Sequence, residues 1–246
     1  MSIYGKLAPK GRSGFGYGST AEDVTVGLAL AGQTVLVTGC NSGIGQETLR
    51  VLALRGARVI GTARSLAKAQ EACASVAGDT VPLACELSDP GSVRRCVQSV
   101  KDGGIQLDAL ICNAGVMAIA KLELVHGYER QFFTNHIGHF MLVTGLLDRL
   151  KERARVVMLS SSAHRQAPKV GIELDNLDGA KRYSPWAAYG QSKLANLLFA
   201  TQLARRFAGT GRTANAVHPG VIRTNLQRHM TPILAASMAL AGPFVL

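Results

Sequence analysis

The 246-residue chain has few charged residues, and it has no acidic residue after position 180. Charged residues make up 17% of it, against about 25% in typical soluble domains, whereas its 47% apolar content is ordinary and excludes a disordered chain. No apolar run reaches the roughly 18 residues of a transmembrane segment, and the N-terminus lacks a secretory signal. We therefore expect a soluble, cytoplasmic protein with no transmembrane segment and at most peripheral membrane contact.

Cysteine is also sparse. The five cysteines form no CxxC pair and leave one thiol unmatched, which argues against a disulfide framework and a tetrahedral zinc site. A reduced, intracellular compartment follows, and no metal site is predicted. His136, His139 and His164 have no ligand-like spacing, so we interpret them as hydrogen-bonding residues of loops and helices.

The lack of acids at the C-terminal end concentrates positive charge there. Residues 181–246 carry eight Lys or Arg residues and account for +8 of the net charge of +11. An anionic partner would suit this region: a phosphate-bearing cofactor, nucleic acid or an acidic membrane surface, with a solvated basic face as the alternative. Because aromatic interleaving and any recognised nucleic-acid module are missing, no nucleic-acid partner is predicted.

From residue 32 onward, short β-branched runs alternate with amphipathic stretches. Residues 1–31 are glycine-rich without a sustained period, and we predict that they form an arm over the domain. The alternation predicts one α/β domain over 32–246, a doubly wound parallel sheet (Rossmann fold) with helices on both faces. The predicted strands are 34–38, 57–62, 80–85, 107–112, 154–160 and 213–218, and the predicted helices are 44–55, 65–77, 90–101, 123–150 and 187–208.

A glycine-rich turn lies between the first strand and the first helix. Glycines allow a pyrophosphate to approach the backbone, while the helix start offers unpaired N–H groups and the positive end of its dipole. An ordinary turn is the alternative, but the strand, turn and helix context favours a dinucleotide fingerprint. The predicted cofactor-binding residues of this turn are Gly39, Asn41, Ser42, Gly43, Ile44 and Gly45.

Tyr189 and Lys193 lie four residues apart on a predicted helix, so they share one face. Lowering the pKa of a phenol by three units takes about 4 kcal/mol. An ammonium about 4 Å away contributes about 4 kcal/mol at an effective dielectric constant of 20, and an oxidised nicotinamide adds a second positive charge. The pair could therefore act as a proton donor and acceptor; a surface helix pair is the alternative.

These motifs, taken together, resemble the short-chain dehydrogenase/reductase family. Four sequence segments resemble those of the branch that contains retinol dehydrogenases and related reductases of plants, fungi and bacteria: LICNAGVMA, TNHIGHF, SSSAH and YGQSKLANLLFA. The resemblance rests on six motifs in order: the turn at 39–45, Asn113-Ala114-Gly115, Asn135, the serines at 160–162, Tyr189 with Lys193, and Pro219-Gly220.

The resemblance implies the catalytic set Asn135, Ser161, Tyr189 and Lys193. Ser161 would hydrogen-bond the substrate oxygen and hold it for Tyr189. Ser162 is the other candidate for this role. The alternative role of Ser161 is to cap the turn between the strand and the following loop. Asn135 would anchor a water, with a core hydrogen bond as the alternative, and Lys193 would also bind the nicotinamide ribose. The resemblance adds further cofactor-binding residues: Asn113, Ala114, Gly115, Tyr189, Pro219, Gly220, Val221, Ile222 and Thr224.

The end of the second strand bears on the choice of cofactor. No acid for a ribose 2′-hydroxyl is present there, and Arg64 can pair with a 2′-phosphate, so NADP(H) is favoured over NAD(H). A solvated arginine is the alternative. Glu86 and Leu87 stand where relatives carry Asp-Leu against the adenine, and the longer acid weakens that assignment.

Only 26 residues follow Gly220, fewer than the family resemblance implies. We expect a substrate segment from about residue 221 and a sheet lacking the family's last strand. Relatives also include dimers and tetramers, which allows a homo-oligomer here.

The leading hypothesis is an NADP(H)-dependent oxidoreductase that interconverts a carbonyl and an alcohol on a small lipophilic or aromatic substrate. The alternative is a cofactor-binding protein for redox sensing or assembly, with little catalytic activity.

Overall fold

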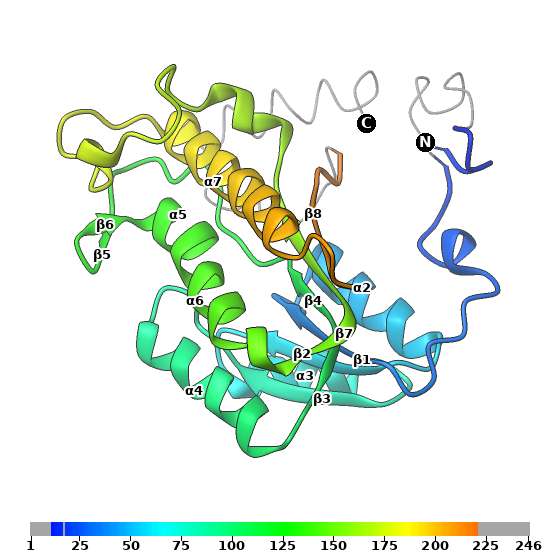
Figure 1. Ribbon diagram of the computed structural model, residues 1–246. Helices are drawn as coiled ribbons and strands as arrows, with labels where there is room; N and C mark the ends of the chain where they lie inside the picture. The colour runs from blue at the N-terminus through cyan, green and yellow to red at the C-terminus, as the bar shows by residue number, and fades with distance from the viewer. Residues whose placement is uncertain (1–10, 17, 221–246) are drawn as a thin grey trace.

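The computed structural model describes residues 11–16 and 18–220, and a six-stranded sheet forms the centre of this part of the chain (Figure 1). Neighbouring strands pair in parallel in the order β3-β2-β1-β4-β7-β8, which confirms the predicted Rossmann-like fold. The strands are β1 (Thr34–Thr38), β2 (Arg58–Ala63), β3 (Thr80–Ala84), β4 (Leu107–Cys112), β7 (Leu150–Leu159) and β8 (Thr213–Val217).

Helices cover both faces of this sheet. Leu36 on β1 packs in the core beneath α4 (Pro90–Asp102), α6 (Gly138–Gly145) and α7 (Pro185–Arg206). Its neighbours Val35 and Val37 point the other way, into the core beneath α2 (Gly43–Leu54) and α3 (Leu66–Ala74). Figure 1 shows α4, α6 and α7 along one side of the sheet and α2 on the other.

The strand order reverses between β1 and β4. From β1 the chain moves outward to β2 and β3, and it then crosses to β4 on the other side of β1. Ligands bind beyond the carboxyl ends of parallel strands at such a reversal. The glycine-rich turn after β1 and the Asn113-Ala114-Gly115 segment after β4 both lie at this point.

The predicted helix over 123–150 is wrong at both ends. Its first part is a hairpin of β5 (Leu124–Val125) and β6 (Tyr128–Glu129). His126 and Gly127 have φ values of +50° and +81°, the two positive values that a tight two-residue hairpin turn requires. At the other end, α6 stops at Gly145, and Leu150 already pairs with Leu107 as the first residue of β7.

Two predictions concern residues that the structure does not describe. The missing last strand and the substrate segment both lie after Gly220, outside the described residues.

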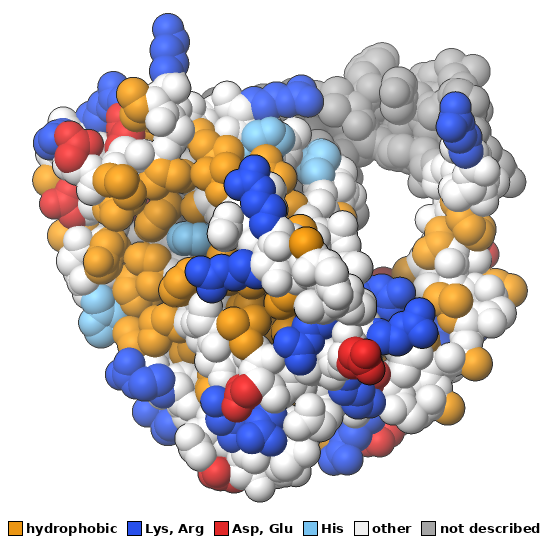
Figure 2. Space-filling view, viewed as in Figure 1, with side chains coloured by type: hydrophobic (Ala, Val, Ile, Leu, Met, Phe, Trp, Pro, Cys, Tyr) orange, Lys and Arg blue, Asp and Glu red, His pale blue; other side chains and the backbone are white. Residues whose placement is uncertain are grey.

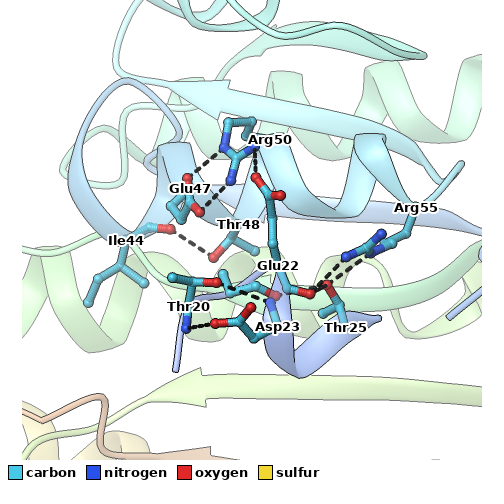
Figure 3. Close-up of polar contacts among 10 residues, drawn as sticks. Thr20, Glu22, Asp23, Thr25, Ile44, Glu47, Thr48, Arg50 and Arg55 are labelled. Atoms are coloured by element: carbon cyan, nitrogen blue, oxygen red, sulfur yellow. Dashed lines mark hydrogen bonds and ion pairs between the residues drawn. The ribbon is translucent and has the colours of Figure 1, made fainter. Parts of the chain in front are cut away.

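The described part of the N-terminal arm contacts α2 (Figure 3). Arg55 donates to the Thr25 hydroxyl at 3.0 Å and to the Glu22 carbonyl at 2.8 Å. Arg50 pairs with Glu22 and with Glu47, each at 2.7 Å. These charged groups are partly exposed, so the ion pairs position the arm more than they stabilise the fold.

Hydrophobic side chains gather over the face formed by α5 (Arg130–Phe132), α6 and α7 (Figure 2). Phe140 is 44% exposed and Leu198 is 50% exposed on this face. The homo-oligomer stays a prediction, since the structure contains a single chain. Within the described ranges, no helix has both the length and the apolarity for a membrane crossing.

Candidate active site and dinucleotide cleft

A cleft of about 170 Å³ lies at the carboxyl ends of the central strands. Fifteen of the predicted residues line it: Gly39, Asn41, Ser42, Gly43, Ile44, Gly45, Arg64, Glu86, Leu87, Asn113, Ala114, Gly115, Tyr189, Lys193 and Pro219. The other lining residues were not predicted as cofactor-binding positions: Ala63, Cys85, Ser88, Val116, Arg130, Thr134, Leu159 and Ser160, of which only Ser160 belonged to a recognised motif. Several of these lie at strand ends beside predicted positions, which is the signal that could have found them.

The glycine-rich turn is packed too tightly for side chains. Gly39 has φ +73°, and a Cβ on Gly45 would lie 2.2 Å from the Gly39 carbonyl oxygen and 2.4 Å from Asn113 Nδ2. At the start of α2, Ser42 makes no side-chain cap, so the first-turn N–H groups stay available where Gly43, Ile44 and Gly45 line the cleft. These residues fit a dinucleotide pyrophosphate, because an anion at this helix start would accept those N–H groups.

Buried hydrogen bonds join the ends of β1 and β4. The Thr38 hydroxyl accepts the N–H groups of Asn113 at 2.9 Å and Ala114 at 3.0 Å, and it lies 2.9 Å from His139 Nε2. His139 Nδ1 lies 2.8 Å from the Asn135 carbonyl, which can only accept, so Nδ1 carries the hydrogen. Burial lowers the pKa of His139 to about 4, so the ring is neutral and Nε2 accepts from Thr38. The sequence pattern predicted a hydrogen-bonding histidine but not this link to the cleft.

Asn135 lies behind the cleft, in a π-helix over Phe133–Ile137. Its amide bonds both backbone groups of Val116, at 2.8 Å and 2.9 Å, and donates to the Ser192 hydroxyl at 2.9 Å. Its carbonyl accepts from His139 and from Asn196. Asn135 therefore ties the segment after β4 to α7, and its water-anchoring role stays a prediction.

Tyr189 and Lys193 line the cleft, and Ser161 lies beside Tyr189. The Ser161 hydroxyl lies near the phenol of Tyr189, close enough to lower the pKa of that phenol. Lys193 Nζ lies 5.6 Å from the centroid of the Tyr189 ring and donates to the Leu159 carbonyl at 3.0 Å. Both Tyr189 and Lys193 are 4% exposed. The phenol, amine and hydroxyl of the predicted set are thus neighbours in space.

The other two serines at the end of β7 have different surroundings. Ser160 donates to the Lys193 carbonyl at 2.9 Å and so joins β7 to α7. Ser162 is exposed, and its backbone N–H donates to His218. Of the three serines, Ser161 is the one that lowers the pKa of Tyr189, and its hydroxyl also accepts the Ala163 N–H at 3.2 Å, the predicted cap.

Burial dominates the proton affinities of this group. It raises the pKa of Tyr189 above its ordinary value, and the hydrogen bond with Ser161 offsets part of this rise. Burial lowers the pKa of Lys193 to about 8. The ammonium of Lys193, with its Nζ 5.6 Å from the centroid of the Tyr189 ring, favours the phenolate through its positive charge. Because burial is the largest cause acting on Tyr189, the pKa of its phenol stays above the ordinary value in the chain without dinucleotide.

Because Lys193 is buried, we expect the free energy of unfolding of the dinucleotide-free chain to increase as the pH rises. Below pH 8 the amine of Lys193 is protonated in both the folded and the unfolded chain, so the buried charge destabilises the folded chain to its full extent. Between about 8 and 10.5 the unfolded chain binds the extra proton, so the free energy of unfolding gains about 3 kcal/mol. Urea unfolding at about pH 7 and about pH 10 measures this gain. It should be missing in Lys193→Met, and equal pH responses of the two proteins would contradict the account.

Arg64 and Glu86 lie at the far end of the cleft. Arg64 follows directly after β2, is exposed, and forms no ion pair within the described residues. Glu86 accepts from the Ser88 N–H at 3.1 Å and from its hydroxyl at 2.8 Å, so its carboxylate is held against its own loop.

The remaining predicted positions lie off the cleft or outside the described residues. Gly220 does not line the cleft, and Val221, Ile222 and Thr224 are not described. Among residues 11–16 and 18–220, no group of His, Cys, Asp and Glu side chains is arranged to hold a metal. His136 contacts Asn196 at 3.2 Å and His164 contacts the Ser161 carbonyl at 2.7 Å.

A doubly wound parallel sheet with a glycine-rich turn at its reversal point is typical of dinucleotide-binding proteins. The short chain dehydrogenase family profile matches residues 33–233. The chain belongs to that family, and it is an oxidoreductase that acts on CH–OH donors.

The known relatives include mouse retinol dehydrogenase 12, which is 41% identical over 251 residues covering 99% of this chain and 77% of the relative. The chain thus resembles the retinol dehydrogenase branch. An uncharacterized protein of Mycobacterium paratuberculosis has a crystal structure with 45% identity and a TM-score of 0.72, covering 82% of this chain and 73% of that one. A short-chain dehydrogenase of Burkholderia cenocepacia, solved with NADP, has 26% identity and a TM-score of 0.68 over 85% and 82% of the two chains.

Proposed function

We propose that this chain interconverts a carbonyl and an alcohol on a small lipophilic substrate, with NADP(H) as cofactor and Tyr189 as the acid and base. The observation that carries the proposal is the convergence of Ser161, Tyr189 and Lys193 beside a cleft that a glycine turn opens to phosphate. When bound, the dinucleotide supplies or accepts the hydride. Residues of the chain itself position the substrate and transfer the proton.

Tyr189 moves the proton in this proposal. In reduction its phenol donates to the substrate oxygen, and in oxidation the phenolate takes the proton back. The Ser161 hydroxyl, which lies near the phenol, holds the substrate oxygen there. Lys193 stabilises the phenolate through its charge, and its bond to the Leu159 carbonyl keeps the amine at the ring.

The surroundings of Tyr189 favour an apolar substrate. Met117, Ala118 and Ala163 form a buried cluster with Tyr189, and Trp186 packs against it. The Trp186 and Tyr189 rings meet edge to face with centroids 6.1 Å apart. These apolar side chains surround the Tyr189 ring, which supports an apolar substrate at its hydroxyl.

Arg64 supports NADP(H) over NAD(H). Its guanidinium lines the cleft at the end of β2 and has no carboxylate partner in the described chain, so it can pair with a 2′-phosphate. Glu86, the other charged side chain nearby, is bonded to Ser88. The Burkholderia relative solved with NADP is consistent with this preference.

The test compares NADPH and NADH oxidation with a panel of aliphatic and aromatic aldehydes, in the wild type and in Arg64→Glu. The wild type should turn over with NADPH. A charged hydrogen bond is worth about 1.5–3 kcal/mol, so Arg64→Glu should raise the KM for NADPH about tenfold to 100-fold and change the KM for NADH little. Equal losses with both cofactors would refute the role of Arg64. NADPH binding without consumption of any aldehyde would favour a sensing or assembly protein instead.

A further inference from the structure

A second cavity lies on the opposite side of α7 from Tyr189. Its volume is about 580 Å³, within the range of small-molecule sites, and it has no lining residue in common with the dinucleotide cleft. Ala187, Ala188 and Gln191 of α7 line it, whereas Tyr189 lines the cleft. Residues of the 167–184 segment form most of the remaining wall. The cavity is therefore a separate place from the cleft that would hold the dinucleotide.

One amide in this wall is buried but has hydrogens without an acceptor. Gln191 is 6% exposed, so more than nine-tenths of its surface is enclosed. Its Oε1 accepts the Glu173 N–H at 2.9 Å, which fixes the orientation of the amide. Its Nε2 has no hydrogen-bond partner among the described residues. Because Nε2 is not one of the fully enclosed polar atoms, its hydrogens are open to the cavity that Gln191 lines. Buried amides are normally bonded, so this donor calls for an acceptor from outside the chain.

The start of α7 adds further donors beside this amide. Ala187 lies four residues before Gln191 on the same face of the helix, and helical side chains lean toward the N-terminus of their helix. The Gln191 amide is therefore directed toward the first turn of α7. Ser184 makes no side-chain cap there, so the first-turn N–H groups carry the positive end of the dipole of a 22-residue helix. The small side chains of Ala187 and Ala188 leave this turn open to the cavity.

The charged side chains of the wall leave one cation unpaired. Arg182 forms an ion pair with Glu173, so these two charges offset each other. Glu129 turns its carboxylate to the start of α5, where Oε2 accepts the Phe132 N–H at 2.8 Å and Oε1 has no accessible surface. Lys169 is exposed and forms no ion pair within the described part of the chain. The groups open to a ligand are thus an amide donor, a helix start and an ammonium, and all three favour an anion.

We propose that this cavity binds a carboxylate on an apolar body. The Gln191 amide and the start of α7 would bond the carboxylate, and Lys169 would supply the opposite charge. A carboxylate brings the acceptor that Nε2 lacks, and its two oxygens can bond several donors at once. Pro168, Val170 and Ala187 provide apolar wall for the rest of the molecule. The ligand is an organic acid of small-molecule size, held on the face of α7 that the proposed reaction does not use.

The experiment is calorimetric titration of the full chain at neutral pH with three probes on one ring system: 1-naphthylacetate, 1-naphthylacetamide and 1-naphthylmethylammonium. Hydrogen bonds to a charged acceptor are the stronger ones, so the acetate should bind at least about tenfold more tightly than the amide, and the ammonium should bind least. In Gln191→Glu the affinity for the acetate should fall at least about tenfold. This variant keeps an acceptor oxygen for the Glu173 N–H and replaces only the free amino group, so it tests the donor and not the fold.

Two further variants place the site. Ala188→Leu, which fills the cavity, should abolish acetate binding, and Lys169→Gln, which removes the exposed cation, should weaken it about twofold to fivefold. Saturating NADPH should leave acetate binding unchanged. The proposal is overturned if no probe binds, if acetate and amide bind equally, or if any of the three variants binds the acetate as the wild type does. Displacement of the acetate by NADPH would also overturn it, because the probe would then occupy the cleft.

Discussion

Tyr189→Phe should reduce aldehyde turnover by at least about a thousandfold and leave the Kd for NADPH within about twofold of the wild type. The substitution removes only the phenol oxygen, the atom whose pKa the Ser161 hydroxyl lowers. A positioned general acid contributes about 10²–10⁴-fold, and no other side chain at this place in the cleft can replace it. The phenylalanine ring keeps its packing against Trp186 and its place beneath Lys193.

Tyr183→Phe is the matched control. Tyr183 also carries a partly buried hydroxyl, but that hydroxyl donates to the Ile119 carbonyl and lies away from the dinucleotide cleft. Its loss should change turnover less than about threefold. If Tyr189→Phe kept a tenth or more of the wild-type rate, or lost NADPH binding together with turnover, the assignment of Tyr189 as acid and base would be wrong.

Gly45→Ala should lower both the stability of the protein and its affinity for NADPH, because it disturbs the glycine-rich turn of the dinucleotide cleft. The new Cβ would lie 2.2 Å from the Gly39 carbonyl oxygen, which is backbone and cannot rotate away. The start of α2 must therefore move relative to β1 and Asn113. We expect a loss of about 1–3 kcal/mol or more in the free energy of unfolding and at least a tenfold weaker Kd for NADPH.

Gly18→Ala is the control for this change, because nothing lies within 4 Å of the added methyl. Urea unfolding and NADPH titration of both variants separate the two effects. A Gly45→Ala protein with wild-type stability and affinity would contradict the packing at this turn.

The sheet, its helical layers and most of the cleft could be predicted from the sequence. Strand and helix alternation fixes the crossover geometry of a parallel sheet, and this geometry brings the ends of β1 and β4 together. Gly39 and Asn113 therefore meet although they are far apart in the chain. Tyr189 and Lys193 were predictable as a pair because a helix places residues four apart on one face.

Features that depend on tertiary packing were not predictable in this way. The hairpin at 124–129 follows from a local turn at His126 and Gly127, in a stretch whose apolar spacing also suits a helix. The 5.6 Å separation of Lys193 from the Tyr189 ring depends on how the amine is drawn to the Leu159 carbonyl. The free amide hydrogens of Gln191 emerge only once all of its neighbours are placed.

The most direct test of the central claim is one sample series in which NADPH binding and aldehyde reduction are both measured, in the wild type and in Tyr189→Phe. We expect both proteins to bind one NADPH per chain with similar affinity, and only the wild type to consume it when an apolar aldehyde is added. Consumption of NADPH by both proteins at the same rate, or failure of the wild type to bind the dinucleotide, would contradict it.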